Sequence, residues 1–206
     1  MNKARNAKEA AQQGDLRERL LDEAITILEA QGPEALTLRA VAGAAGVSHM
    51  APYRHFADKE ALLAAIAERG FRALSAAMGD AGRSGQDLLS QLHAFGLAYL
   101  AFARRRPALY RLMFGPALAG KPQYAALAQA GGEAFAHCAD AVAAILRERA
   151  VVADAEPQAL AVATWALVHG LAMLLIDGRL AITEGGAEED ALIAHVLALH
   201  ARTFRG

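Results

Sequence analysis

The chain has a single cysteine, Cys138, and a single tryptophan among its 206 residues. One cysteine cannot form a disulfide within the chain, which excludes the small disulfide-stapled folds of secreted proteins. Aromatic residues make up only 6% of the chain and runs of β-branched residues are scarce, so no sheet is predicted. The chain is instead 55% hydrophobic and rich in alanine and leucine, which favour helix. We therefore predict an all-α protein.

Neither sign of charge is in excess, and the formal net charge is -1. This balance does not decide whether the protein binds nucleic acid, because an acidic C-terminal half can mask a local basic surface. A signal peptide is not predicted either, since charged residues interrupt the first apolar positions, at Asp15, Arg17, Glu18 and Arg19. We expect a cytoplasmic protein.

Only one long uncharged run is present, over residues 159–176, ALAVATWALVHGLAMLLI. Its length of about 18 residues is the lower limit for a membrane span. Its alanine content, the central His169 and Gly170, and the absence of a flanking basic cluster argue against that interpretation. A helix that is apolar on all sides is otherwise covered by its own chain or by a partner. We expect no membrane span.

The most informative stretch covers residues 37–63, TLRAVAGAAGVSHMAPYRHFADKEALL. Thr37 can cap a first helix with its hydroxyl, and apolar residues recur at helical spacing after it. Gly46 permits the left-handed turn that ends this helix, and Val47 is the apolar residue that locks the turn. The pattern predicts a helix followed by a tight turn.

A second and a third helix are predicted directly after that turn. Ser48 can cap the second helix, which is short because Pro52 lies close to its start, in a first turn where proline is accepted. Tyr53 and Phe56 are expected on its packing side. Asp58 can cap the third helix. Helix, turn and helix form the DNA-binding motif whose second helix enters the major groove.

Several fixed spacings in this stretch match a known family together. The matching residues are Leu36-Thr37-Leu38-Arg39, Val41-Ala42, Ala45-Gly46-Val47-Ser48, Tyr53-Arg54-His55-Phe56 and Asp58-Lys59-Glu60-Ala61-Leu62-Leu63. They closely resemble the DNA-binding domain of TetR-type transcriptional regulators, over about the first third of the chain. Met50-Ala51 replaces the common Gly-Thr or Pro-Thr pair, and Pro52 replaces an aliphatic residue. These departures leave the operator sequence undetermined.

The rest of the chain is compatible with the same family. Trp165 followed by His169-Gly170 resembles a Trp-x-x-x-His-Gly signature of one group of TetR-type ligand domains. We predict a flexible tail over residues 1–14, a three-helix helix-turn-helix domain over 15–63, and a larger helical ligand-binding and dimerisation domain over 64–206. About nine helices are expected in all.

The predicted DNA contacts lie on the second helix and around it. Residues of the second helix can reach base edges. Hydroxyl, imidazole and cationic side chains around that helix can bind phosphates and so fix the register of the protein on DNA. The residues are Thr37, Arg39, Ser48, His49, Met50, Ala51, Tyr53, Arg54, His55 and Lys59. The resemblance implies backbone contacts for the tyrosine, the histidine and the lysine. Packing between helices is the alternative for Tyr53 and His55, and capping is the alternative for Thr37 and Ser48.

A ligand site is predicted in the helical remainder, where aromatic side chains and a few polar tips lie on helices that pack together. Such a mixture is typical of sites for apolar ligands. The candidate residues are Phe95, Tyr99, Phe102, Tyr110, Phe114, Phe135, Trp165 and His169. For each of them an ordinary core position is the alternative.

An enzyme is not predicted, because the sequence contains no HExxH, GxSxG or P-loop spacing. His137 and Cys138 are neighbours on a helix and point in different directions. A metal site from His93, His137, Cys138 and His169 is the alternative to satisfied core histidines. We predict neither a metal nor a cofactor.

These observations predict a homodimeric, ligand-responsive transcriptional regulator, and specifically a repressor. Its expected partners are a palindromic or pseudo-palindromic operator DNA, a small apolar effector, and a second copy bound through residues 157–178 and 188–204. The alternative is a helical small-molecule binding or catalytic protein that does not use the helix-turn-helix for DNA.

Overall fold

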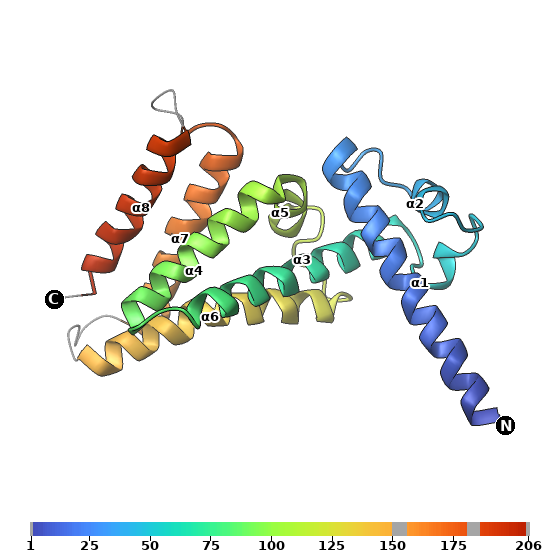
Figure 1. Cartoon of the computed structure of the whole chain (residues 1–206), viewed down its shortest axis with the longest axis horizontal. Coiled ribbons are helices and arrows are strands. Elements are labelled where there is room, and N and C mark those ends of the chain that lie inside the picture. The colour runs from blue at the N-terminus through green and yellow to red at the C-terminus, as the bar shows by residue number, and fades with distance from the viewer. Residues whose placement is uncertain (1, 150–155, 181–185, 205–206) are drawn as a thin grey trace. The chain divides into compact units, whose positions relative to one another are not determined.

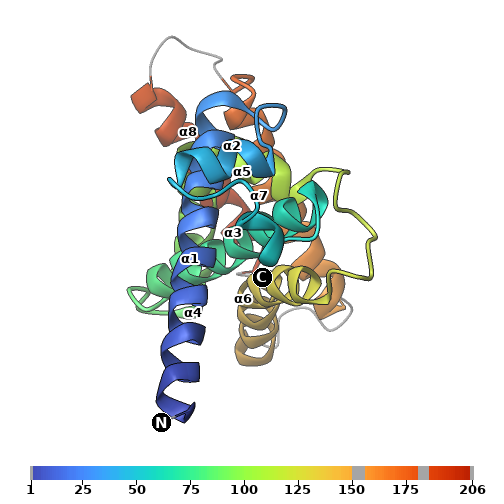
Figure 2. The same cartoon turned by 90° about the vertical axis from the view of Figure 1, so that its right-hand side faces the viewer.

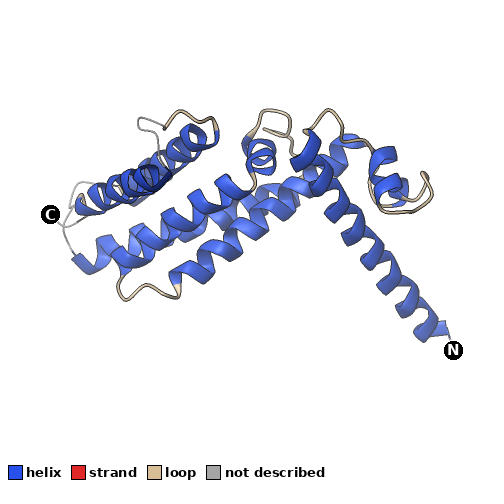
Figure 3. Ribbon diagram, turned by 45° about the horizontal axis from the view of Figure 1, so that its top comes forward, coloured by secondary structure: helices blue, strands red, loops and turns tan. Residues whose placement is uncertain are grey.

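The computed structural model describes residues 2–149, 156–180 and 186–204, and this part of the chain contains helices and loops without a strand (Figure 3). It has eight α-helices and one short 3-10 helix. Their bounds are α1 Asn2–Gln31, α2 Leu38–Ala44, η1 Pro52–Arg54, α3 Lys59–Gly82, α4 Leu88–Arg105, α5 Pro107–Phe114, α6 Ala125–Arg149, α7 Pro157–Ile176 and α8 Gly186–Arg202. The predicted all-α class is confirmed.

The chain divides into two compact units, each built from two separate segments of the sequence. Unit 1 comprises Met1–Gly70 and Ala108–Leu127, and unit 2 comprises Phe71–Pro107 and Ala128–Gly206. The boundary therefore falls inside α3 and α6 and next to the first residue of α5. The sequence pattern predicts the boundary after residue 63 and contains no sign that residues 108–127 return to unit 1.

Helix α1 begins at Asn2, where a flexible tail over residues 1–14 was predicted (Figure 1). The tail prediction relied on the missing apolar stripe. Alanine, lysine, glutamate and glutamine are nevertheless strong helix formers, and they dominate this segment. From Leu20 onward α1 buries Leu20, Leu21 and Leu28 in the core of unit 1. In Figures 1 and 2 its N-terminal turns project beyond the other elements of that unit.

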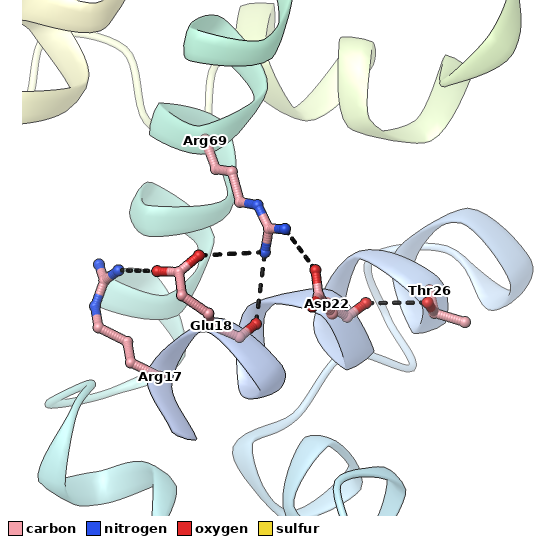
Figure 4. Close-up of polar contacts among 5 residues, drawn as sticks. All are labelled: Arg17, Glu18, Asp22, Thr26 and Arg69. Carbon is pink, nitrogen blue, oxygen red and sulfur yellow. Dashed lines mark hydrogen bonds and ion pairs between the residues drawn. The ribbon is translucent and has the colours of Figure 1, made fainter. Parts of the chain in front are cut away.

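Arg69 ties α3 to α1 within unit 1 (Figure 4). Its guanidinium binds the Asp22 carboxylate at 2.5 Å and the Glu18 carboxylate at 3.7 Å. It also donates to the Glu18 carbonyl oxygen at 3.5 Å. Arg17 binds the same Glu18 carboxylate at 3.3 Å. The partly exposed cluster holds α3 and α1 in one orientation by geometry more than by its modest energy.

The returning segment is fastened to unit 1 at two carboxylates. Glu29 of α1 accepts hydrogen bonds from the backbone N–H groups of Ala108 and Leu109, at 3.2 and 3.0 Å. These groups belong to the first turn of α5, where no carbonyl of the helix can accept from them. Glu60 of α3 accepts from the side chains of Lys121 and Tyr124, and these bonds lower the pKa of its carboxyl.

Unit 2 is built around α4, which packs mainly on α7 and also on α8. Asp87 caps α4 by accepting from Ser90 N–H at 2.7 Å. The second half of α3 runs beside α6, where the Ser75 hydroxyl and His137 Nε2 lie 2.9 Å apart (Figure 1). Helix α3 continues to Gly82, although its last turns contain two glycines. A Cβ at Gly82 would lie 2.2 Å from the Phe95 ring, so this glycine allows the helices to approach closely.

Helix α7 contains the long uncharged run. By length and composition this helix could cross a membrane. Its most apolar 18-residue stretch has a mean hydropathy of 2.1, and 33% of that stretch is buried in the protein. Ala161, Thr164, Val168, Leu171 and Ala172 form its buried face. The helix ends at Ile176, and beyond it Gly178 has φ +66° and the Arg179 N–H bonds the Leu174 carbonyl at 2.8 Å. Much of this apolar helix remains uncovered in a single copy.

Candidate nucleic-acid interface and ligand site

The turn after α2 has the geometry that the sequence predicts. Thr37 accepts from the Ala40 N–H at 3.0 Å and so caps α2. Gly46 has φ +66° and follows the last turn of α2. The Val47 N–H reaches back to the Ala42 carbonyl at 3.0 Å. This is the bond of a Schellman cap, in which glycine takes the left-handed position at no steric cost.

The predicted second helix is wrong in its detail. Residues 48–55 form successive tight turns around the 3-10 helix Pro52–Arg54 instead of an α-helix. The Ser48 carbonyl accepts from Ala51 N–H at 2.8 Å, because Pro52 has no N–H to give the next bond of an α-helix. The Ser48 hydroxyl accepts from the Met50 N–H at 3.3 Å. We call residues 48–55 the recognition turn.

Most of the predicted DNA-contact residues are exposed. On the recognition turn these are Ser48, His49, Met50, Tyr53 and Arg54, whereas Ala51 and His55 are half-buried. The predicted packing position of Tyr53 is wrong, because this side chain is 52% exposed, while Phe56 is buried as expected. Thr37, Arg39 and Lys59 flank the turn on exposed positions of the same unit.

One helix cap and one side-chain bond to a loop carbonyl orient the flanks of the recognition turn. Asp58 accepts from the Ala61 N–H at 2.8 Å and starts α3 as predicted. The Lys59 ammonium donates to the Pro33 carbonyl at 3.0 Å, across to the loop that precedes α2. A phosphate could replace this exposed carbonyl as the partner of the ammonium.

The electrostatics of His55 arise from its neighbours. Burial lowers the pKa of His55, and the positive charges of Arg17 and Arg54 lower it further. The imidazole is therefore biased toward its neutral form in the absence of an anion. Its ring lies 6.3 Å from the Phe56 ring.

Sequence analysis missed two arginines of α1. The Arg17 guanidinium lies over the Phe56 ring at 5.6 Å from its centre. Arg19 donates to the Ala45 carbonyl at 3.0 Å, at the C-terminal end of α2 where carbonyls lack helical partners. Both interactions link residues that are far apart in sequence. The only local signal is a pair of cations beside the apolar face of the first helix.

In unit 2 the structure brings part of the predicted ligand set together on α4, α6 and α7. The Tyr99 hydroxyl and His169 Nδ1 lie 3.1 Å apart. His169 and Trp165 have ring centres 5.6 Å apart, and Trp165 and Phe135 have ring centres 5.8 Å apart in an edge arrangement. Burial lowers the pKa of His169. Tyr99 is buried, and the other three are half-buried. We call these residues the aromatic cluster.

The remaining candidates do not join the aromatic cluster by a described ring contact. Phe95 packs on His137 at 5.7 Å, and Phe102 is buried. Tyr110 and Phe114 belong to unit 1, where their rings lie 4.8 Å apart.

A recess of about 410 Å³ lies elsewhere in unit 2, between α4 and α8. Its lining residues are Asp87, Leu89, Ser90, His93, Ala198, Ala201 and Arg202. None of the candidates belongs to this set.

Three of the four residues considered as metal ligands have another partner. His137 bonds Ser75, His169 bonds Tyr99, and the Cys138 thiol donates to the Ala161 carbonyl at 3.7 Å. Burial raises the pKa of Cys138 to about 11, so the thiol is protonated. In the described parts of the chain, no group of three or more His, Cys, Asp or Glu side chains could hold a metal ion.

An exposed recognition turn in one unit, and a second unit whose described residues form helices and loops, are typical of a helix-turn-helix regulator with a separate helical domain. Residues 20–66 match the family described as bacterial regulatory proteins, tetR family. Residues 92–199 match the tetracyclin repressor-like C-terminal domain. The chain belongs to the TetR family and is a DNA-binding transcriptional regulator. Regulators of this class are generally non-enzymatic.

Known proteins are similar to the chain over most of its length. The nucleoid occlusion factor SlmA of Idiomarina loihiensis is 30% identical over 142 residues, which are 69% of this chain and 71% of that protein. A protein of unknown function from Rhodococcus sp. RHA1 is 30% identical, with a TM-score of 0.74 over 92% of this chain and 93% of that one. The TetR-family regulator PfmR from Thermus thermophilus shares the fold at 19% identity, with a TM-score of 0.66 over 89% and 97%.

Proposed function

We propose that this regulator is a repressor, and that a small, largely apolar ligand releases it from its operator. The observation that supports the ligand is the aromatic cluster, where the rings of Phe135 of α6 and Trp165 of α7 lie beside the polar pair of Tyr99 and His169. Sites of this composition bind apolar molecules and orient them by a few polar groups.

The chemistry of the polar pair narrows the ligand class. The lowered pKa of His169 favours a neutral imidazole, which both donates and accepts a hydrogen bond. Tyr99 adds a hydroxyl that can do the same. We expect a ligand with a flat or aliphatic apolar body and a neutral hydrogen-bonding group. A carboxylate is disfavoured, because a neutral pair offers it no opposite charge.

Helix α3 supplies the route from ligand to DNA. Its first residues, as far as Gly70, belong to unit 1, and its remainder belongs to unit 2. A ligand that shifts the helices of unit 2 changes the tilt of α3 and hence the spacing of two recognition turns in a dimer. Operator half-sites have a fixed spacing, so a small tilt misaligns one of them.

Regulators of the TetR family bind operator DNA as dimers, and we propose the second copy on α7 and α8, within residues 157–178 and 188–204. Large apolar side chains are exposed there in one copy, namely Val162, Leu174 and Leu199, at 42–45%. Covering them by the same helices of a second subunit gives an intersubunit four-helix bundle. Such an interface accounts for the uncharged face of α7 without a membrane, as expected for cytoplasmic regulators.

For the operator, we propose a palindromic or pseudo-palindromic site contacted by the recognition turn and its flanks. We expect Ser48, His49, Met50 and Ala51 to meet base edges and Arg54 to reach a base or a phosphate. We expect phosphate contacts from the flanking donors Thr37, Arg39, Tyr53, His55 and Lys59.

The test combines DNA binding with the intrinsic fluorescence of Trp165, the only tryptophan of the chain. Fluorescence anisotropy of DNA from upstream of the gene should show tight, salt-dependent binding. An apolar ligand should change Trp165 emission and weaken operator binding by about 5- to 150-fold, the range of typical couplings. Operator DNA must weaken ligand affinity by the same factor. Equal ligand affinity with and without operator would exclude that ligand as the effector.

A further inference from the structure

A recess of about 310 Å³ opens on unit 1 beside the recognition turn. Gly14, Leu16 and Arg17 of α1 line it, together with Arg54 and His55 of the recognition turn. The polar side chains of this lining are two guanidiniums and an imidazole, with no carboxylate among them. Guanidiniums carry a permanent charge and a fork of N–H donors that matches phosphate oxygens.

Arg17 is held at this recess by two contacts. Its guanidinium lies over the Phe56 ring at 5.6 Å from the ring centre and binds the Glu18 carboxylate at 3.3 Å. Glu18 is shared with Arg69, which also binds the Asp22 carboxylate, so these two arginines and two carboxylates balance in charge (Figure 4). Arg54 adds a further cation, and the lining of the recess itself contains no carboxylate.

We propose that this recess receives one phosphate group of the operator backbone, with Arg17 as a DNA-positioning residue supplied by α1. The proposal rests on the DNA-binding function and extends the interface beyond the helix-turn-helix. Arg54 and His55 form one wall of the recess and belong to the recognition turn, so a duplex held by that turn brings its backbone alongside. Such a contact fixes register and carries no base preference of its own.

The first test replaces the charge of Arg17 and keeps its stem. Each lost phosphate contact lowers the slope of log affinity against log salt by about 0.9, hence by about two units in a dimer with two recesses. Arg17→Gln should show this loss for operator and unrelated DNA alike. Affinity at 50 mM relative to 200 mM salt should then fall by about 12-fold compared with wild type. The control is Arg83→Gln, which removes an exposed arginine of unit 2 that pairs with Asp80.

The second test adds a charge without removing any contact. A Cβ at Gly14 meets nothing within 4 Å, so a side chain there fits without a clash. Gly14→Glu places a carboxylate at the recess and should weaken DNA binding and lower the salt slope. Gly14→Ala should bind like wild type. Thermal unfolding of all four variants checks that they fold.

The outcomes separate this inference from the function it rests on. Wild-type protein that binds no DNA would remove both. Tight wild-type binding with an unchanged salt slope in Arg17→Gln and Gly14→Glu would overturn the recess alone. Calorimetry with inorganic phosphate distinguishes the two sources of a phosphate group. We expect no saturable heat with inorganic phosphate up to about 1 mM, a Kd that already corresponds to weak binding. Saturable binding that Arg17→Gln abolishes would make the recess a small-anion site instead.

Discussion

Titration of His55 should make operator affinity depend on pH. In the free protein its pKa is lowered by burial and by Arg17 and Arg54. A backbone phosphate beside it favours the imidazolium, so the pKa rises on binding and a proton is taken up. Operator affinity should therefore increase as pH falls through the window between the bound and the free pKa. It should level off below the free value, where His55 is charged in both states.

The measurement is operator affinity between about pH 5.5 and 8 at constant ionic strength, the range in which histidine titrates. Each unit by which binding raises the pKa adds up to about tenfold in affinity per subunit at the acidic end. His55→Gln should flatten this profile, and His195→Gln, at an exposed position of α8, should keep it. A profile that stays steep in His55→Gln would assign the proton to another group.

Substitutions of Lys59 and His49 should weaken DNA recognition in different ways. Lys59→Ala removes a cation that is close to the recognition turn and should weaken binding to all sequences, lowering the salt slope by about two units per dimer. His49→Ala should relax the preference at one base pair per half-site by about 1–3 kcal/mol. Salt titrations and a panel of single-base operator variants separate these effects. Two variants that behave as wild type would place this surface away from DNA.

At the scale of elements, the carboxylate of Glu29 in α1 caps the N-terminus of a different helix, α5. Glu29→Gln leaves the first N–H groups of α5 with a neutral amide acceptor in place of a charge at the positive helix end. We expect a loss of about 1 kcal/mol in the free energy of unfolding, from urea titration monitored by circular dichroism. Glu34→Gln, on the exposed loop before α2, should stay within about 0.5 kcal/mol of wild type. A loss of equal size in both would indicate a general charge effect.

The success of sequence analysis differed between elements for physical reasons. Thr37, Gly46 and Asp58 were predicted correctly because capping and left-handed turns depend on a few neighbouring residues. The recognition turn was predicted as a helix because Pro52 was treated as a tolerated first-turn residue. Its missing N–H instead converts the segment to tight turns. The roles of Arg17 and Glu29 depend on contacts across the fold, which no local pattern contains.

At the scale of the whole molecule, the exposed apolar side chains of α7 predict the assembly. Leu174→Glu should convert the dimer into monomers, since it places a charge in the proposed four-helix interface. Leu97→Glu is the matched control, because Leu97 of α4 has the same 42% exposure outside α7 and α8. Sedimentation velocity at micromolar concentration measures the outcome. Dissociation by Leu97→Glu alone would move the interface to α4.

The division of the chain was the part least accessible from sequence. The pattern distinguishes a helix-turn-helix from later helices, and it places the ligand candidates on one continuous domain. Tyr110 and Phe114 instead lie in the segment that returns to unit 1. Their aromatic character is compatible with either unit, so composition alone does not assign them. The contact of Trp165 with His169 was predictable because the two residues are four apart on one helix face, whereas Tyr99 and Phe135 reach them from other helices.

The return of residues 108–127 to unit 1 bears on how the protein is made. The acceptors at Glu29 and Glu60 have no counterpart to bind until this segment leaves the ribosome. At about 5–20 residues per second, synthesis from residue 70 to residue 127 takes about 3–11 s. The hydrogen bonds to Glu29 and Glu60 in unit 1 therefore form only after the first helices of unit 2 have been synthesised. A chain interrupted within that interval carries a recognition turn on an unfinished support, so translation itself links completion of the DNA-binding unit to synthesis of the first helices of unit 2.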